Sequence, residues 1–163
     1  MRTSKFIAAV LMVISCGIHA ASLQGKVVGV ADGDTVTVLD DQNKQHKIRL
    51  QGIDAPEKAQ AFGQKSKQSL NQLVHSKQVV VEFEKKDKYG RIVGKVLLNG
   101  TDVCLEQIKL GMAWHYKQYA SEQPNADREI YAQSERDARA QALGLWKDKN
   151  PTPPWEFRRQ SKN

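Results

Sequence analysis

Residues 49–57 read Arg49-Leu50-Gln51-Gly52-Ile53-Asp54-Ala55-Pro56-Glu57, which places one arginine and two carboxylates at the corner where a strand passes into a loop. The alternation of side chains along a strand puts Ile48 and Leu50 on one face and Arg49 on the other. Pro56 stiffens the corner that presents Glu57. Taken one at a time, these residues are ordinary surface charges, so their interpretation depends on the rest of the chain.

Two further polar clusters flank this stretch. Asp32-Gly33-Asp34-Thr35 lies upstream, and Asp87-Lys88-Tyr89-Gly90-Arg91 lies downstream. By itself the first is an ordinary turn, because Asp and Gly are typical turn residues, and Arg91 alone could be a surface charge. Together the three clusters supply carboxylates that suit a hard cation and guanidinium groups that suit phosphate. The combination favours phosphodiester chemistry.

The remaining pattern predicts an α+β fold. Alternating apolar residues predict strands over residues 26–30, 35–39, 45–50, 78–84 and 92–98. Helical spacing predicts helices over 59–75, 102–110 and 127–143, with Gly111 as a left-handed stop, and residues 112–114 are expected to return to the sheet. We therefore expect a closed five-stranded β-barrel of the oligonucleotide-binding (OB-fold) type with three helices.

Length and composition set the domain organisation. A chain of 163 residues is suited to one domain, which we place at residues 22–146, followed by a Pro-rich basic tail at 147–163. Pro151, Pro153 and Pro154 predict that this tail is an extended appendage. The net charge of +7 favours polyanionic partners, although it also serves solubility. The histidines show no zinc-type spacing, and we expect a monomer without a stable protein partner.

The N-terminus predicts export. Residues 1–21 combine Arg2 and Lys5, an apolar run and small residues near Ala20, which is the layout of a secretory signal peptide. We expect a periplasmic or secreted protein. Cys16 offers an alternative, because the residues before it loosely resemble a lipoprotein cleavage box, and lipidation there would hold the protein at a membrane. If Cys16 leaves with the leader, Cys104 has no intrachain disulfide partner.

In their order and separation, the three polar clusters resemble the hallmarks of the staphylococcal nuclease (thermonuclease) family, and the resemblance covers residues 25–146. It implies a calcium-dependent, sugar-nonspecific endonuclease that hydrolyses phosphodiester bonds of DNA and RNA and leaves 3′-phosphate ends. The chain departs from the family pattern after Glu57, where the loop looks shorter than in the staphylococcal type.

The resemblance also implies roles for individual residues. Calcium would be bound by the side chains of Asp34 and Asp54 and by the main-chain carbonyl of Ala55. Glu57 would be the general base that activates water, while Arg49 and Arg91 would hold the phosphate and stabilise its charge. Lys88 and Tyr89 are expected to contact substrate. Among Trp114, Tyr116 and Tyr119 the sequence does not decide which residue contacts a nucleotide, and core packing is the favoured role for Trp114.

Two other functions compete with this interpretation. One is a non-catalytic OB-fold module that binds nucleic acid, and the other is a phosphodiesterase for small nucleotides. A degenerate binding domain would be expected to lack several of the catalytic side chains. This chain keeps Asp34, Arg49, Asp54, Glu57 and Arg91, which favours an enzyme.

Overall fold

The computed structural model describes residues 21–161. The predicted signal peptide, apart from Ala21, and the alternative lipidation site at Cys16 lie outside these residues. Within residues 21–161, no helix combines the length and the apolar character that crossing a membrane requires.

Five strands form the predicted closed barrel: β1 (Ala21–Val30), β2 (Thr35–Leu39), β3 (Gln45–Leu50), β5 (Gln78–Lys86) and β6 (Ile92–Leu98). They pair antiparallel in the order β3-β2-β1-β5-β6, and a parallel pairing of β3 with β6 closes the ring. β1 begins before the predicted residue 26, because its first half pairs with β5 and its second half with β2.

Three two-residue strands complete the sheets. β7 (Thr101–Asp102) extends the barrel sheet beside β6. β4 (Ile53–Asp54) pairs with β8 (Trp114–His115) in a separate sheet, so residues 112–114 do not return to the barrel sheet as predicted, and the strand begins only at Trp114. This small sheet holds Asp54 in a fixed position beside the end of β3.

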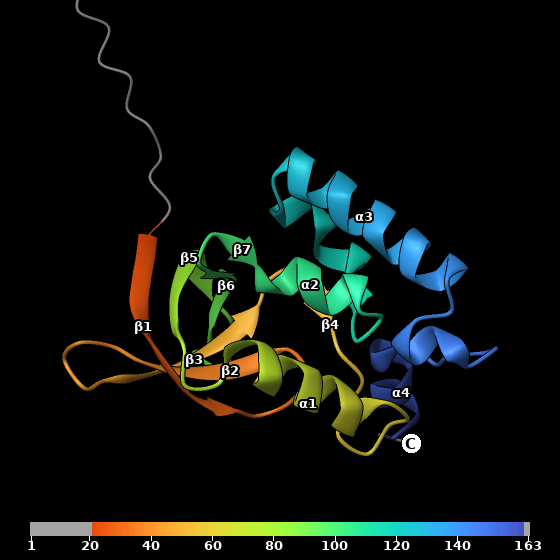
Figure 1. Cartoon of the computed structure of the whole chain (residues 1–163), viewed down its shortest axis with the longest axis horizontal. Helices are drawn as coiled ribbons and strands as arrows, with labels where there is room; N and C mark the ends of the chain where they lie inside the picture. Colours follow the sequence, from red (N-terminus) through yellow and green to blue (C-terminus); the bar gives the residue numbers. More distant parts are fainter. Residues whose placement is uncertain (1–20, 162–163) are drawn as a thin grey trace, which may run out of the picture.

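Within residues 21–161, four α-helices and two 3₁₀ helices lie on one side of the barrel strands (Figure 1): α1 (Gly63–Val74), α2 (Val103–Lys109), η1 (Lys117–Glu122), α3 (Asn125–Ala140), η2 (Gly144–Lys147) and α4 (Pro154–Gln160). α2 confirms the predicted helix over 102–110. The Asp102 side chain accepts a hydrogen bond from the Leu105 N–H and so caps the helix, and Gly111 is left-handed at φ 65°. α1 starts later than predicted, because Phe62 adopts a left-handed φ of 65° that an α-helix cannot contain. α3 ends at Ala140, before the predicted residue 143, and Ala142 is left-handed.

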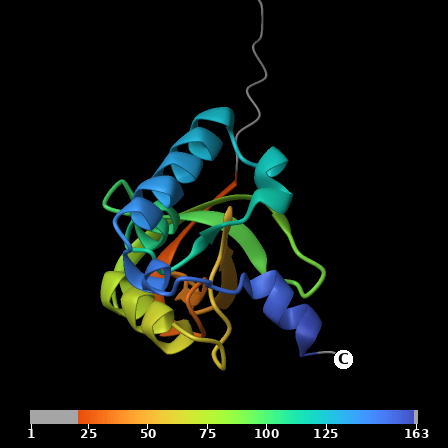
Figure 2. The ribbon, with the colours of Figure 1, turned by 90° about the vertical axis from the view of Figure 1, so that its right-hand side faces the viewer.

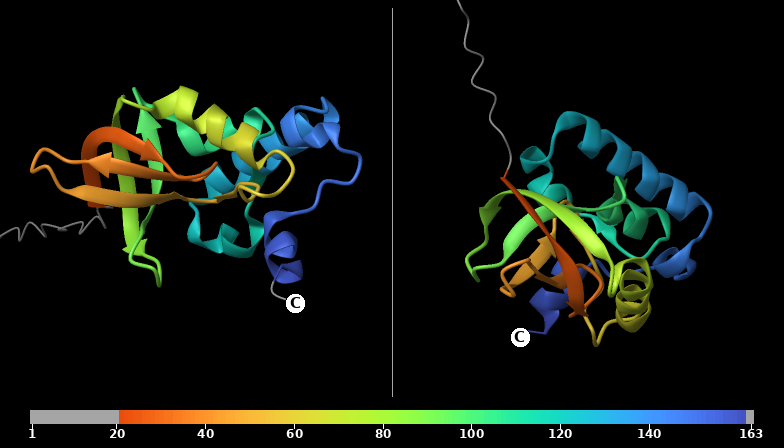
Figure 3. Two further views of the ribbon diagram at one scale, coloured as in Figure 1. Left: turned by 90° about the horizontal axis from the view of Figure 1, so that it is seen from below. Right: turned by 60° about the vertical axis from the view of Figure 1, so that its left-hand side comes forward.

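The prediction of an extended C-terminal tail is wrong. Pro153 precedes α4 and Pro154 is its first residue, a position where the missing N–H of proline was not needed for helix hydrogen bonds. The indole of Trp155 stacks on Tyr116 at 5.6 Å with an interplanar angle of 12°. The β2–β3 hairpin extends from one end of the molecule, and α4 lies at the other end (Figure 3). α4 is separate from the long helix α3 (Figure 2).

The core has two parts. The barrel interior contains the fully buried side chains of Val36, Ile48 and Val81, and α1 covers it with Leu70 and Val74. A second apolar cluster joins Trp114, Ala138, Leu145 and Trp146 beneath the tail. Trp114 is 7% exposed, which confirms its predicted core packing.

Candidate active site

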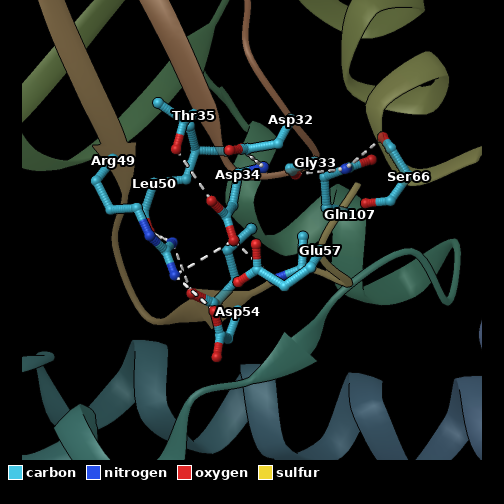
Figure 4. A network of polar contacts seen from close by, with 12 residues as sticks. Asp32, Gly33, Asp34, Thr35, Arg49, Leu50, Asp54, Glu57, Ser66 and Gln107 are labelled. Atoms are coloured by element: carbon cyan, nitrogen blue, oxygen red, sulfur yellow. Dashed lines mark hydrogen bonds and ion pairs between the residues drawn. The ribbon is translucent and has the colours of Figure 1, made fainter. Parts of the chain in front are cut away.

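Arg49 lies at the centre of a polar network at the end of β3. Its Nη1 donates to the carbonyls of Leu50 at 2.9 Å and Ile53 at 2.8 Å, so the corner that follows the strand fixes the guanidinium. Its Nη2 lies 2.9 Å from Asp54 Oδ1 and 3.2 Å from Asp34 Oδ2. Figure 4 shows Arg49 reaching between the two aspartates. The structure therefore brings together one predicted phosphate ligand and the two predicted side-chain ligands of the metal.

Asp34 is held by its own turn and by the loop that carries Asp54. The Asp34 N–H donates to Asp32 Oδ1 at 3.1 Å, and the Ala55 N–H donates to Asp34 Oδ2 at 2.7 Å. Burial raises the pKa of Asp34 to about 7; Asp32 and Asp54 add to the rise, and Arg49 opposes it. Asp34 is therefore a buried acid whose negative charge one arginine does not fully offset.

Gln107 holds the turn of residues 32–35 from the helix α2, and no sequence pattern had marked it as a site residue. Its fully buried amide donates through Nε2 to the carbonyls of Gly33 at 2.8 Å and Ser66 at 3.2 Å (Figure 4). Ser69 Oγ donates to Gln107 Oε1 at 2.7 Å. The available signal was a polar amide among the apolar residues of a short helix, because a buried amide must find hydrogen-bond partners.

Glu57 lies at the rim of the same site. Its main-chain N–H donates to Gln60 Oε1 at 3.1 Å, which holds the loop after Pro56. Its carboxylate accepts a hydrogen bond from Arg158 Nη1 at 2.8 Å and forms no other ion pair within residues 21–161. The side chain is 40% exposed, so water can reach it.

Arg91 does not touch the carboxylates of the Arg49 network. Its Nε lies 2.7 Å from Asp87 Oδ2, while Asp87 Oδ1 accepts the N–H groups of Tyr89 and Arg91 and shapes the turn. Within residues 21–161 both terminal nitrogens of Arg91 lack a hydrogen-bond partner, so they are available to an anion. Tyr89 is 72% exposed, and its ring lies 5.5 Å from the Arg91 guanidinium and 5.1 Å from Lys88 Nζ.

One cavity of about 620 Å³ unites these groups. All the predicted catalytic, metal-ligating and substrate-binding residues line it, together with Lys85, Lys86, Tyr116 and Tyr119. Its lining combines six lysines and arginines with six aspartates and glutamates, so cationic groups are present to contact a phosphodiester. Among the aromatic residues that the sequence left undecided, both tyrosines line this cavity, whereas Trp114 belongs to the second core cluster.

The carboxylates at the base of the cavity fit a hard divalent cation. Asp34 and Asp54 are 6% and 1% exposed, and oxygen is the ligand that calcium prefers. Within residues 21–161 no group of three or more His, Cys, Asp or Glu side chains is placed to hold a metal. Main-chain carbonyls and water would therefore supply the remaining ligands, as calcium sites allow.

Arg158 is the second functional residue that the sequence analysis missed. From α4 its guanidinium reaches both oxygens of Asp54, at 2.7 and 3.2 Å, and the carboxylate of Glu57. It also lines the cavity. The tail thus adds a third arginine to the site.

This chain is similar to proteins of a known family. The profile of the family described as "Staphylococcal nuclease homologue" matches residues 47–148. A protein of Haemophilus influenzae named "Uncharacterized endonuclease" is 47% identical over 137 residues, which is 84% of this chain and 74% of that protein. A "Micrococcal nuclease" of Shigella flexneri is 39% identical over 166 residues, covering 96% of this chain and 91% of that protein. With this barrel and this degree of similarity, the chain belongs to the family of staphylococcal nuclease homologues.

Proposed function

We propose that this protein is a calcium-dependent, sugar-nonspecific endonuclease that hydrolyses phosphodiester bonds of DNA and RNA and leaves 3′-phosphate ends. The observation that carries the proposal is the shared cavity, in which Arg49 joins two buried aspartates while Glu57 and Arg91 line the wall. The names of the relatives, endonuclease and micrococcal nuclease, support the same class of activity.

The residues divide the chemistry among themselves. Glu57 accepts a proton from a water molecule whose oxygen attacks phosphorus. The bond between phosphorus and the 5′-oxygen breaks, the phosphate stays on the 3′-oxygen, and the departing 5′-oxygen takes a proton from solvent.

Arg49 and Arg91 hold the phosphate. Arg91 can use both terminal nitrogens, in the bidentate manner that suits phosphate oxygens. The Nη1 and Nη2 groups of Arg49 already have protein partners, which leaves Nε for the substrate. Each guanidinium that strengthens its contact as charge builds on the phosphate is expected to contribute on the order of a hundredfold in rate, by analogy with oxyanion-hole donors.

Asp34, Asp54 and the Ala55 carbonyl would hold calcium, which would share the Asp54 carboxylate with Arg158. When bound, calcium would lower the pKa of water and offset negative charge on the phosphate. The raised pKa of Asp34 supports this role, because a cation beside a buried carboxylate favours its charged form.

The cavity supports low sequence specificity. Its charged groups suit phosphate, which every nucleotide shares, and contacts to phosphate carry no direct information on base sequence. The exposed rings of Tyr89 and Tyr119 offer faces on which any base can stack, whereas Trp155 covers one face of Tyr116. The same groups suit single strands of either sugar.

Export is part of the proposal. Residues 1–21 have the composition of a secretory signal, so we propose that the nuclease acts in the periplasm or outside the cell. Mass spectrometry of the mature N-terminus would decide between cleavage near Ala20 and a lipidated Cys16.

Hydrolysis of single-stranded DNA with calcium and with a chelator tests the central claim. We expect the chelator to abolish cleavage. Glu57→Gln is expected to lower kcat by about 10²–10⁴ and Arg91→Ala by about 10². Glu129→Gln and Arg136→Ala, at exposed positions on α3, are the matched controls. Cleavage undiminished by the chelator would exclude the metal mechanism, and unchanged rates in both variants would exclude the assigned roles.

A further inference from the structure

Arg158 connects the C-terminal helix to two groups of the site. Its Nη2 lies 2.7 Å from Asp54 Oδ2, and its Nη1 lies 3.2 Å from Asp54 Oδ1 and 2.8 Å from Glu57 Oε1. The guanidinium therefore contacts Asp54 through both terminal nitrogens, and its Nη1 also contacts Glu57. Such charge-assisted, bidentate contacts are both strong and directional.

Glu57 depends on this contact for its position. Within residues 21–161 its carboxylate is hydrogen-bonded to Arg158 alone, through Oε1, and Oε2 has no partner. Pro56 and Gln60 fix the main chain of Glu57 but leave its side-chain torsions free. A half-exposed glutamate without a partner samples several rotamers, so removal of Arg158 would leave the carboxylate poorly placed.

The tail holds Arg158 firmly enough for this role. Trp155 stacks on Tyr116 and meets Trp114 edge-on with ring centroids 5.5 Å apart, while Pro154 is buried. Gln60 links the Glu57 loop to the C-terminal tail, because its Oε1 accepts a hydrogen bond from the Glu57 N–H and its Nε2 donates to the carbonyl of Thr152. Partial burial lowers the pKa of Arg158, but its bonds to Asp54 and Glu57 more than offset this, and the net shift is upward.

We infer that Arg158 is a positioning residue for the proposed general base: it holds Oε1 of Glu57 beside Asp54 and leaves Oε2 free to take the proton of the attacking water. The inference rests on the proposed nuclease activity. In this role the helix α4 contributes a residue to the active site.

Steady-state cleavage of a fluorogenic single-stranded oligonucleotide tests the inference, with Arg158→Ala, Arg158→Lys and Arg159→Ala compared to the wild type. Arg159 is the matched control, since it is the next residue on α4, is exposed and forms no ion pair within residues 21–161. We expect Arg158→Ala to lower kcat about 10- to 100-fold while KM changes by less than about threefold. We expect the kcat of Arg158→Lys to lie between those of the wild type and Arg158→Ala, because the lysine ammonium cannot make the bidentate contact of a guanidinium.

A double-mutant cycle separates positioning from a structural role. In a Glu57→Ala background, Arg158→Ala should lower kcat much less than it does in the wild type, because the contact with Glu57 is gone and only the contacts with Asp54 remain. Added guanidinium should restore part of the activity of Arg158→Ala only when Glu57 is present. An equal loss in both backgrounds would overturn the inference. A rate for Arg158→Ala that matches Arg159→Ala would also overturn it, and a rate above the wild type would show instead that the tail obstructs the site.

Near-ultraviolet circular dichroism of the stacked Trp155 and Tyr116 reports whether α4 stays docked in each variant. If Arg158→Ala loses this signal, Arg158→Lys decides: retention of the signal with a reduced kcat supports the inference, and retention with full kcat overturns it. A wild-type protein that cleaves no oligonucleotide would refute the proposed function, and the inference would fall with it. An active wild type with insensitive Arg158 variants would refute the inference alone.

Discussion

Gly33 shows how closely the Asp34 turn packs against its supports. A Cβ atom at this position would lie 1.9 Å from Ser66 Oγ and 2.7 Å from the Ala55 side chain. Ser66 is fully buried, and its hydroxyl donates to the carbonyl of Met112 at 2.6 Å, so it has little freedom to move. The glycine is needed here for close approach between the turn and α1.

Gly33→Ala is therefore expected to lower the free energy of unfolding by about 1–3 kcal/mol, the usual result of overpacking a closely packed site. Urea denaturation measures this change. Gly29→Ala is the control, because a Cβ there would meet Thr37 at an ordinary 3.6 Å. Equal stability of the two variants would show that the turn has more room than the structure indicates.

The residues that the sequence revealed are those whose partners are near in the chain. Arg49, Asp54 and Glu57 lie within one short stretch, and turn chemistry marks Asp34 and Asp87. Gln107 and Arg158 were missed because their partners lie 74 positions away for Gly33 and 101 for Glu57. No local pattern encodes such contacts, since they depend on how the finished fold places helices around the barrel.

The tail helix is the element that the sequence least revealed. Its prolines were read as helix breakers, although a proline at the first helical position is favourable. The barrel strands were predictable because alternation persists over several residues. β4 and β8 have two residues each, too few for any periodicity, and they form because the fold brings their edges together.

α4 is held by packing and not by its own helical propensity. A helix of seven residues is unstable alone in water. Trp155 contributes two aromatic pairs, with Tyr116 and Trp114, each of about 0.5–1.5 kcal/mol beyond its buried area. Loss of this side chain should therefore release the helix.

Trp155→Ala is expected to raise the rate of native-state trypsin cleavage after Arg158 and Arg159 about tenfold or more, because the tail opens locally while the barrel stays folded. Mass spectrometry of the fragments over time measures the rate. Glu156→Ala changes an exposed neighbour on the same helix and should leave cleavage unchanged. Cleavage of Trp155→Ala at the wild-type rate would mean that other contacts suffice to hold α4.

At the scale of the whole molecule, closure of the barrel assembles the site. The parallel pairing of β3 and β6 puts Arg49 opposite Val93 and brings the turn of Arg91 to the same end of the barrel. The Asp34 turn arrives there because β2 runs antiparallel to β3, with Thr35 opposite Arg49. Three clusters far apart in the sequence therefore face one cavity, and a barrel that failed to close would have no site.

Calcium binding should consequently stabilise the whole barrel. A ligand that binds only the folded state, at a concentration 100-fold above its Kd, adds about 2.7 kcal/mol to the free energy of unfolding. For a chain of this size we expect the melting temperature to rise by roughly 5–10 °C. Thermal unfolding followed by circular dichroism, with calcium and with chelator, measures the shift without any substrate.

Asp34→Asn should lose this calcium-dependent rise and still fold. The raised pKa of Asp34 means that burial already disfavours its charge, so a neutral amide of the same shape removes a metal ligand at little cost to the barrel. Asp137→Asn, on the exposed face of α3, should keep the full rise. If Asp34→Asn melts at a higher temperature with calcium just as the wild type does, the cation binds elsewhere and the paired aspartates serve only to hold Arg49.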